Sequence, residues 1–155
     1  MHSYSKLKIC VAFSCGGHYA EAMQLMPIMK NYTVYYAAPY AATTKDLKRI
    51  YFLKDPADIG NFASLFLNIV ISLKMLIKER PDVIVTTGAE IVIPLCYLSK
   101  TFFRTKIVFI ETFARVTSPS FTGRIIYPVA DIFLVQWQNL LVFYGKKAQY
   151  VGRLF

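Results

Sequence analysis

Residues Ser14 to Glu21 bring glycines, a histidine and a carboxylate together where the chain is expected to pass from strand to helix. An apolar run at residues 9–13 precedes them, and apolar positions spaced three and four apart follow over residues 22–29. Gly16 and Gly17 allow the backbone to turn with positive φ and let a ligand approach closely. Because free N–H groups point outward from the first turn of a helix, this turn can hold an anion such as phosphate.

His18 lies in the first turn of the predicted helix, where it could act as a base. An imidazole exchanges a proton near neutral pH, which suits removal of a proton from an acceptor hydroxyl. Glu21, three residues later, would share the same helix face and could orient the ring. The alternative is a solvent-facing histidine at a helix start. A catalytic Cys15 thiolate is disfavoured, because no arginine follows nearby to close a phosphate loop.

A second group of polar residues follows the apolar run at residues 106–110. Glu111 could act as a catalytic carboxylate or bind a sugar hydroxyl, or it could only accept N–H groups of the loop after it. Arg115 could bind phosphate through its guanidinium group. Trp137, the one tryptophan of the chain, could stack on a sugar or pack in the core.

The composition indicates a membrane surface or a phosphate-bearing ligand as a partner. The chain has 155 residues, a net charge of +9 and a hydrophobic fraction of 55%, and its mean hydropathy is +0.41. A basic and apolar chain of this kind is suited to anionic head groups or phosphates. Nucleic acid is disfavoured as a partner, because the basic residues are scattered and form no recognisable nucleic-acid module.

Cysteine and histidine usage predicts no metal site and no disulfide framework. The three cysteines are irregularly spaced, which indicates reduced thiols in a cytoplasmic compartment. The two histidines and the carboxylates show no metal-ligand spacing. The first residues lack the apolar core of a signal peptide. We therefore expect one domain over residues 1–155, with no metal and no cofactor of its own.

Strand-like apolar runs alternate with helical patterns along the whole chain. Strands are expected at residues 6–13, 32–38, 83–87, 106–110, 131–135 and 148–151. Helices are expected at residues 18–26, 62–80, 91–101, from the N-cap Thr122 onward and at 139–144, with a loop and a short helix within residues 41–60. This alternation predicts an α/β fold with a parallel, doubly wound sheet. Ligands bind outside the carboxyl ends of such strands, where four polar clusters fall: residues 15–18, 86–90, 111–115 and 136–137.

The stretch from Phe62 to Arg80 is the most apolar helix expected in the chain. Its few polar residues repeat at every fourth position: Ser64, Asn68 and Ser72. A helix that is apolar nearly all round is either buried or in contact with lipid. Lys74 and Lys78 interrupt it before the length of about 20 residues that a spanning helix needs. It is therefore either a core helix or a helix lying in the bilayer interface, with membrane contacts predicted at Phe62, Leu65, Phe66, Ile69, Lys74 and Lys78.

Several motifs occur in an order that resembles one class of glycosyltransferase subunit. They are Gly16-Gly17-His18 with Glu21, Thr86-Thr87-Gly88-Ala89, Glu111 to Val116, Thr122-Gly123-Arg124 with Tyr127-Pro128 and Ala130-Asp131, and Val135-Gln136-Trp137. Together they resemble the membrane-associated, acceptor-side subunits of two-component glycosyltransferases. These are the PssD-type bacterial polysaccharide biosynthesis proteins and the eukaryotic membrane subunits of the N-acetylglucosamine transferase that makes lipid-linked chitobiose. The N-terminal lobe of MurG-type transferases is a more distant likeness.

The resemblance implies a single Rossmann-like lobe, the N-terminal half of a split GT-B glycosyltransferase. This half would hold an undecaprenyl-pyrophosphate-linked sugar acceptor at the cytoplasmic face of the plasma membrane, and would be inactive alone. A small soluble partner subunit would bring the UDP-sugar. The implied pathway is exopolysaccharide, capsule or lipid-linked oligosaccharide synthesis.

The resemblance also implies roles for individual residues. His18 would help deprotonate the acceptor hydroxyl, and Glu111 is the second catalytic candidate. The predicted contacts with the acceptor and its pyrophosphate are Ser14, Gly16, Gly17, Glu21, Thr87, Gly88 and Arg115. The predicted interface with the partner subunit consists of Gln136, Trp137, Leu154 and Phe155.

The sequence departs from the resemblance in one respect, and two other functions stay open. The eukaryotic members have an N-terminal spanning helix, whereas this sequence starts almost directly with its first strand, so membrane contact is expected from residues 62–80 or from basic patches. The chain could instead be a non-catalytic scaffold that recruits and stimulates a partner transferase, and substitution of His18 or Glu111 would separate these readings. It could also be an independent nucleotide-binding enzyme, which tight binding of a UDP-sugar or NAD by the isolated chain would support.

Overall fold

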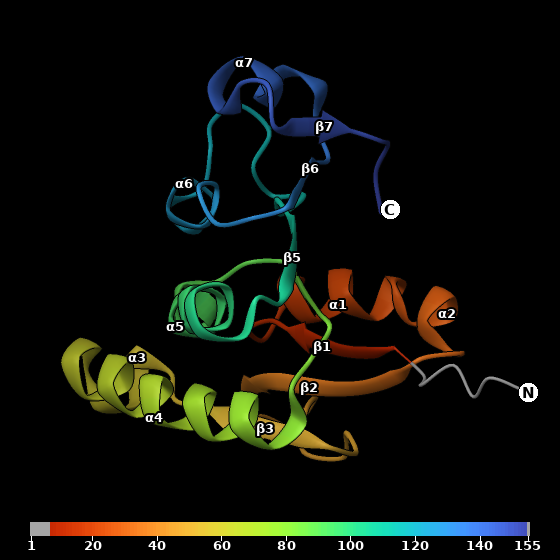
Figure 1. The fold of residues 1–155 in the computed structure, drawn as a ribbon. Coiled ribbons are helices and arrows are strands. Elements are labelled where there is room, and N and C mark those ends of the chain that lie inside the picture. Colours follow the sequence, from red (N-terminus) through yellow and green to blue (C-terminus); the bar gives the residue numbers. More distant parts are fainter. Residues whose placement is uncertain (1–6, 155) are drawn as a thin grey trace, which may run out of the picture.

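Seven parallel strands form one sheet in the computed structural model, which describes residues 7–154 (Figure 1). The strand order is β3-β2-β1-β4-β5-β6-β7, and every neighbouring pair is parallel. The strands are β1 Lys8–Ala12, β2 Thr33–Pro39, β3 Ile50–Leu53, β4 Val83–Thr86, β5 Lys106–Ile110, β6 Ile132–Val135 and β7 Ala148–Tyr150. The predicted α/β fold with a parallel, doubly wound sheet is confirmed.

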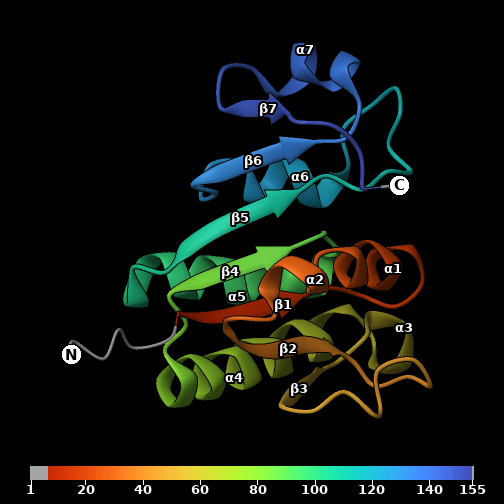
Figure 2. The same ribbon diagram turned by 90° about the vertical axis from the view of Figure 1, so that its right-hand side faces the viewer.

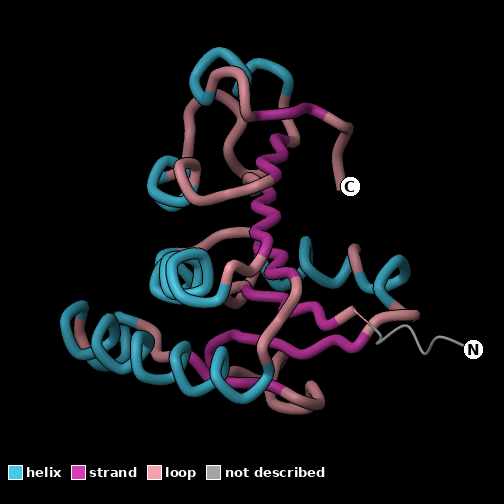
Figure 3. Tube along the Cα trace, in the orientation of Figure 1, coloured by secondary structure: helices cyan, strands magenta, loops and turns pink. Residues whose placement is uncertain are grey.

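Helices cover both faces of the sheet (Figures 1 and 3). One face carries α1 Gly17–Gln24 and α2 Met26–Met29, whose Ala22, Leu25 and Met29 belong to one buried cluster. The other face carries α4 Asn61–Glu79, α5 Ile93–Leu98, α6 Phe121–Ile126 and α7 Leu141–Tyr144, which contribute Met75, Leu95, Ile126 and Tyr144 to a second cluster. The short elements are α3 Pro56–Ile59, η1 Glu90–Val92, η2 Ser99–Phe103 and η3 Gln138–Leu140.

The carboxyl ends of all seven strands meet at one edge of the sheet (Figure 2). The strand order changes direction between β1 and β4, which are neighbours in space. Their register pairs Ala12 with Thr86, so the turn after β1 lies beside the turn after β4. This arrangement brings together segments some 70 residues apart in the sequence, as the hydrogen bonds between His18 and Thr87 show.

Three expected elements differ from the structure. Strand β3 falls inside residues 41–60, where only a loop and a short helix were predicted; it is a four-residue edge strand between basic residues, too short to show a period. The helix expected at residues 91–101 is divided into η1, α5 and η2. The N-cap of α6 is Ser120 rather than Thr122, because the Ser120 hydroxyl accepts the N–H of Gly123 at 2.8 Å. The predicted break at Pro27 is confirmed, since a new helix, α2, begins at Met26.

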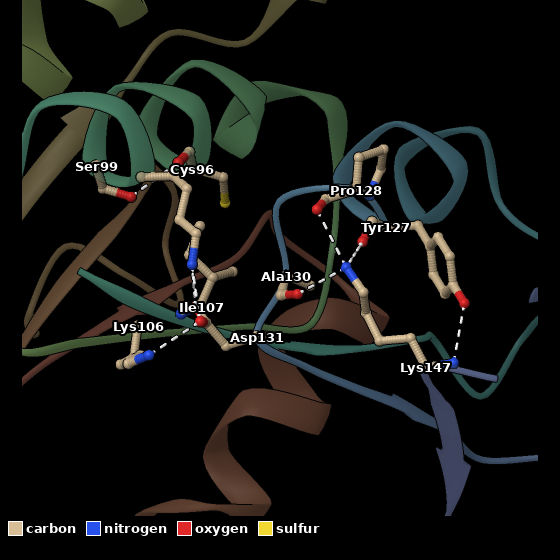
Figure 4. Close-up of polar contacts among 10 residues, drawn as sticks. Cys96, Ser99, Lys106, Ile107, Tyr127, Pro128, Ala130, Asp131 and Lys147 are labelled. Carbon is tan, nitrogen blue, oxygen red and sulfur yellow. Dashed lines mark hydrogen bonds and ion pairs between the residues drawn. The ribbon is translucent and has the colours of Figure 1, made fainter. Parts of the chain in front are cut away.

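Asp131, just before β6, connects the start of β5 and the end of the helical segment before it at the amino edge of the sheet. Its carboxylate accepts hydrogen bonds from Lys100 Nζ at 2.7 and 2.8 Å, from Lys106 Nζ at 3.2 Å and from the Ile107 N–H at 2.9 Å (Figure 4). Burial alone would raise the pKa of Asp131, but these donors outweigh it and lower the pKa from 3.8 to about 2. The ionised form is therefore part of what stabilises this edge.

Lys147, next to β7, supports the chain after α6. Its Nζ donates to three backbone carbonyls, those of Tyr127, Pro128 and Ala130 (Figure 4). A cation at the end of a helix satisfies carbonyls that have no partner within the helix. The contact holds the end of α6, and hence the loop before it, against the sheet.

Candidate functional site

A cavity of about 310 Å³ lies at the carboxyl edge, among the segments that follow β1, β3, β4 and β5. It brings together five predicted residues from three separate motifs: Ser14, His18, Gly88, Glu111 and Arg115. Three of the four predicted polar clusters therefore converge on one space. Sequence reasoning missed Asp55 and Phe121, which also line it. The pair Asp55-Pro56 is a typical helix start, with the Asp55 side chain accepting the N–H of Ala57 at 2.9 Å, and could have located α3.

His18 is held by the turn after β4. Its Nδ1 lies 2.7 Å from the Thr87 carbonyl oxygen, and the Thr87 hydroxyl donates to the His18 carbonyl at 2.9 Å. A carbonyl only accepts, so Nδ1 carries the proton and Nε2 is the basic nitrogen of the neutral ring. Within residues 7–154, no side chain or backbone group hydrogen-bonds Nε2. The prediction that Glu21 orients His18 is wrong, because Thr87 takes that role.

The backbone of Gly88 lies beside the His18 ring. A Cβ at Gly88, where φ is +105°, would lie 3.4 Å from the His18 Cε1. Ala89 adopts φ 90° and ψ 143°, a conformation that glycine adopts far more readily than alanine. This strained turn follows β4 directly, and it closes one wall of the cavity against the imidazole.

Glu21 is buried and does not reach the cavity. Its Oε1 accepts the Thr112 hydroxyl at 2.9 Å and the Phe113 N–H at 2.7 Å, so α1 is clamped to the loop after β5. Burial raises the pKa of Glu21, although the two donors and the nearby His18 partly oppose this. The predicted contact of Glu21 with the acceptor is therefore wrong, because the carboxylate faces the protein interior and positions the loop instead.

Glu111 is also buried, and the protein saturates its carboxylate. Oε1 accepts the Thr112 N–H at 3.1 Å, and Oε2 accepts the N–H and the hydroxyl of Ser120, each at 3.1 Å, and the hydroxyl of Tyr144. Burial, followed by the hydrogen bond to Glu111, raises the pKa of Tyr144. Of the readings left open, acceptance of N–H groups from the following loop is confirmed. Glu111 lines the cavity but holds its wall in place, which does not favour the predicted catalytic role.

Gly123 permits this arrangement around Glu111. A Cβ there would lie 2.5 Å from Glu111 Oε2 and 2.9 Å from Ser120 Oγ, and would also overlap the Tyr144 hydroxyl. Only glycine lets the start of α6 approach the carboxylate so closely. Thr122 lines the cavity, and Gly123 behind it lets this wall form, for a steric reason that composition does not reveal.

Gly16 and Gly17 lie at the start of α1, open to solvent. Gly16 has φ +73°, as expected for a turn that precedes a helix, and a Cβ on either glycine would meet nothing within 4 Å. The first turn of α1 contains no acidic side chain that would repel an anion. Neither glycine lines the cavity, so their predicted contact with a pyrophosphate stays a prediction. Arg115 lines the cavity and is exposed to solvent.

Cys15 is not suited to nucleophilic catalysis in this structure. Burial, and then the charge of Asp55, raises the pKa of its thiol, which disfavours the reactive thiolate. Cys10 and Cys96 are buried, and all three cysteines are free. Among residues 7–154, no three His, Cys, Asp or Glu side chains are grouped closely enough to hold a metal ion.

Gln136 and Trp137 hold the C-terminal segment rather than forming an open surface. Gln136 is buried; its Nε2 donates to the Glu111 carbonyl at 3.1 Å, and its Oε1 accepts the Leu154 N–H at 2.9 Å. Trp137 is half-buried, donates to the Phe113 carbonyl at 2.8 Å and lies under the Arg153 guanidinium, 4.0 Å from the ring centroid. The prediction that Gln136 contacts a partner directly is therefore wrong, because its buried amide already forms hydrogen bonds within the chain. The prediction for Phe155 lies outside the described residues.

The family model for Alg14-like oligosaccharide biosynthesis proteins matches residues 56–154, well over half of the sequence. The chain belongs to this family. UDP-N-acetylglucosamine transferase subunit alg14 of Schizosaccharomyces pombe is 45% identical over 76 residues, which are 46% of this chain and 36% of that protein. The ALG14 subunit of Yarrowia lipolytica is 26% identical over 180 residues, 97% of this chain and 82% of that one.

Solved structures share the fold of this Alg14-like chain. MurG of Acinetobacter baumannii matches with a TM-score of 0.77 at 12% identity, over 95% of this chain and 45% of that one. UDP-N-acetylglucosamine 2-epimerase of Rickettsia bellii matches with a TM-score of 0.77 at 15% identity, over 97% and 46%. At these identities the likeness shows the Rossmann-like fold alone. The chain spans just under half of both proteins, and about a third of the S. pombe relative.

Helix α4 of this Alg14-like chain packs with its polar side inward. Ser64 and Asn68 are each 1% exposed, whereas Phe62 and Phe66 are 90% and 66% exposed. The other predicted membrane contacts, Leu65, Ile69, Lys74 and Lys78, are exposed as well. Among the described residues α4 is the one helix long and apolar enough to span a membrane, a test that core helices of soluble proteins also pass. The C-terminal part of α4 does pack in the core, because Met75 and Leu76 are fully buried there.

Hydrogen bonds explain this orientation of α4. Asn68 accepts the Lys54 N–H at 2.7 Å and donates to the Lys54 carbonyl at 2.9 Å, and the Ser64 hydroxyl donates to that same carbonyl at 2.6 Å. Lys54 directly follows the edge strand β3, where backbone groups need partners. Ser64 and Asn68 therefore supply these partners, and an apolar surface is left facing outward.

Proposed function

We propose that this chain is the acceptor-binding half of a split UDP-N-acetylglucosamine transferase. The observation that carries the proposal is His18, whose Nδ1 is fixed by Thr87 while Nε2 is free beside the cavity. The family match and the names of the relatives support the transferase class and the UDP-N-acetylglucosamine donor. Since the relatives are named as subunits of a UDP-N-acetylglucosamine transferase, a second subunit would supply the lobe that binds the nucleotide sugar.

The proposed chemistry needs one base from this chain. The acceptor hydroxyl attacks the anomeric carbon of the donor sugar, a new C–O bond forms, and the bond from that carbon to the UDP oxygen breaks. UDP leaves with the electron pair, and the hydroxyl proton passes to His18 Nε2. Thr87 stabilises the imidazolium that results, because its carbonyl oxygen accepts a hydrogen bond from Nδ1–H before and after the transfer. Glu111 positions the loop around the acceptor and does not exchange the proton.

We propose a lipid-linked sugar, such as one carried on undecaprenyl pyrophosphate, as the acceptor. Arg115 at the cavity and the N–H groups at the start of α1 are groups that can bind its phosphates. The pathway would be lipid-linked oligosaccharide, exopolysaccharide or capsule synthesis, as in the PssD-type proteins. The reaction would take place at the cytoplasmic face of the plasma membrane.

The outward apolar face of α4 supports a peripheral attachment to that membrane. Phe62 and Phe66 are placed to enter the acyl region, with Lys74 and Lys78 near anionic head groups. A spanning arrangement would pull the polar stripe away from Lys54 and leave backbone groups of the sheet edge without partners. We therefore favour a helix that lies in the interface.

The test is sugar transfer from UDP-N-acetylglucosamine by this chain together with its nucleotide-sugar-binding partner, using His18→Asn. The asparagine amide can still donate to Thr87 but cannot take the proton, so kcat is expected to fall by about 10²- to 10⁴-fold. Gln24→Ala, at the exposed end of the same helix, is the matched control and should keep full activity.

The same assay separates the competing functions. If His18→Asn keeps its kcat while the two subunits still associate, the chain contributes no base and acts as a scaffold for the partner. Transfer by this chain without the partner would contradict the split arrangement. Transfer only by the pair, lost in His18→Asn, is the expected result.

A further inference from the structure

A second cavity, of about 200 Å³, lies next to the His18 cavity. It is formed between the first half of α4 and the segment that follows β4, with Leu65, Ile93 and Pro94 among its walls. Pro56, Glu90 and Ile91 line both cavities, so the two spaces are direct neighbours. A ligand long enough can therefore occupy both at once.

Two polar side chains in the wall of the second cavity are already paired within the protein. Ser64 and Asn68 belong to its lining, but both are bonded to the backbone of Lys54 and to each other, with 3.3 Å between Asn68 Nδ2 and Ser64 Oγ. Side chains used in this way have little left to offer a polar ligand or water. Leu65, Ile91 and Ile93, with Pro56 and Pro94, supply an apolar contact surface that suits a hydrocarbon chain, and the exposed Asn61 and Glu90 complete the lining.

The second cavity also adjoins the outward apolar face of α4. Leu65 is shared between the two: it lines the cavity and is half exposed on the face that carries Phe62 and Phe66. The polar His18 cavity, the apolar second cavity and this apolar face thus follow one another. A hydrocarbon chain that starts in the His18 cavity can therefore reach this face through the second cavity.

We propose that the second cavity binds the isoprene units nearest the pyrophosphate of a polyisoprenyl-linked acceptor. The proposal rests on the proposed function, because it is the acceptor head group in the His18 cavity that places the start of the chain at Pro56 and Ile91. The remainder of the chain leaves past Leu65 toward the lipid. The cavity thereby selects acceptors by the first part of their lipid, and not only by their sugar.

The experiment compares two water-soluble acceptors with the same sugar pyrophosphate head, one on a farnesyl chain and one on a single dimethylallyl unit. Membranes are left out, so attachment of α4 to a bilayer does not contribute. The paired subunits should show a kcat/KM at least about tenfold higher for the farnesyl acceptor, because more apolar surface leaves water.

Two matched variants on the exposed face of α4 locate the effect. Leu65→Asp places a charge in the wall of the second cavity and should lower kcat/KM for the farnesyl acceptor about tenfold, with a smaller loss for the dimethylallyl acceptor, which fills less of the cavity. Leu73→Asp lies on the same helix, is also exposed and does not line the cavity, so both acceptors should react as before. Equal effects of the two variants, or no preference in the unaltered pair, would overturn the proposal.

A binding readout keeps this proposal separate from the transferase proposal. A photoreactive farnesyl pyrophosphate should modify residues within 61–68 and 91–94, and unlabelled farnesyl pyrophosphate should compete with it. Modification at these residues, combined with no sugar transfer by the pair to any acceptor, would refute the transferase function and leave the isoprenoid site standing. Competable modification elsewhere, or none, would refute the isoprenoid site itself.

Discussion

Gly123→Ala is the substitution that tests most directly how the cavity wall is built. The new Cβ would lie 2.5 Å from Glu111 Oε2 and 2.9 Å from Ser120 Oγ, and would overlap the Tyr144 hydroxyl. All three groups belong to one buried hydrogen-bonded cluster, so none can move without loosening another. We expect the protein to unfold more easily.

The expected cost can be worked out from two contributions. Overpacking by one methyl group in a closely packed region costs about 1–3 kcal/mol. A weakened hydrogen bond to a buried carboxylate adds about 1.5–3 kcal/mol. We therefore expect the free energy of unfolding to fall by about 3 kcal/mol, and Tm by about 6–12 °C for a domain of this size.

The assay is urea unfolding followed by circular dichroism, with Gly17→Ala as the control. Gly17 has no positive φ and a Cβ there meets nothing within 4 Å, so that variant should be neutral or stabilised by about 0.4–1 kcal/mol. The decisive measurement is a double-mutant cycle with Tyr144→Phe, which removes the hydroxyl that the new Cβ overlaps.

In the Tyr144→Phe background, Gly123→Ala should cost about 1 kcal/mol less than in the unaltered protein, because one of the three obstructing atoms is gone. Additivity of the two substitutions within about 0.5 kcal/mol would show that Gly123 does not lie against this cluster. A Gly123→Ala variant as stable as Gly17→Ala would refute the steric argument altogether.

Three further substitutions probe separate features by urea unfolding. Asn68→Ala leaves the partly buried N–H and carbonyl of Lys54 without that partner and should cost about 1–3 kcal/mol; a loss no greater than that of the exposed Ile69→Ala would contradict the inward polar stripe. Asp131→Asn should cost about 1–2 kcal/mol at pH 7, after allowance for solvent screening, because the pKa of Asp131 is lowered from 3.8 to about 2. A lowered pKa contributes stability above pH 4 that is lost as the pH falls to about 2, so the difference from the unaltered protein should vanish at pH 2; a constant difference would refute the linkage. Ala89→Gly should stabilise by about 0.5–1 kcal/mol, since φ 90° suits glycine, and a loss of stability would show that Ala89 is not strained.

Much of the fold follows from local patterns that the sequence displays. The runs that became β1, β4 and β5 are continuous and apolar, as expected of strands buried on both faces. Strand β3 carries no such signal, because it is a short edge strand whose identity depends on its pairing with β2. Local composition cannot report a pairing partner.

The position of the site could be predicted from the sequence, but the structural roles of its residues could not. The rule that ligands bind at the carboxyl ends of parallel strands brought His18, Gly88, Glu111 and Arg115 to one cavity. It did not indicate that Thr87 would fix the imidazole, or that Glu21 would bond the loop after β5. These hydrogen bonds join segments about 70 and 90 residues apart, so they depend on how the strands are ordered.

Helix α4 shows most clearly which properties follow from the sequence and which from the tertiary structure. The sequence by itself determined that Ser64, Asn68 and Ser72 lie on one stripe, because 3.6 residues per turn places every fourth residue on the same side. Periodicity defines the angle between side chains, but not the direction in which any of them faces. Only the tertiary structure decided that the stripe faces inward, because the backbone of Lys54 at the sheet edge needs hydrogen-bond partners and two members of the stripe, Ser64 and Asn68, provide them. The outward apolar face is the consequence of that choice.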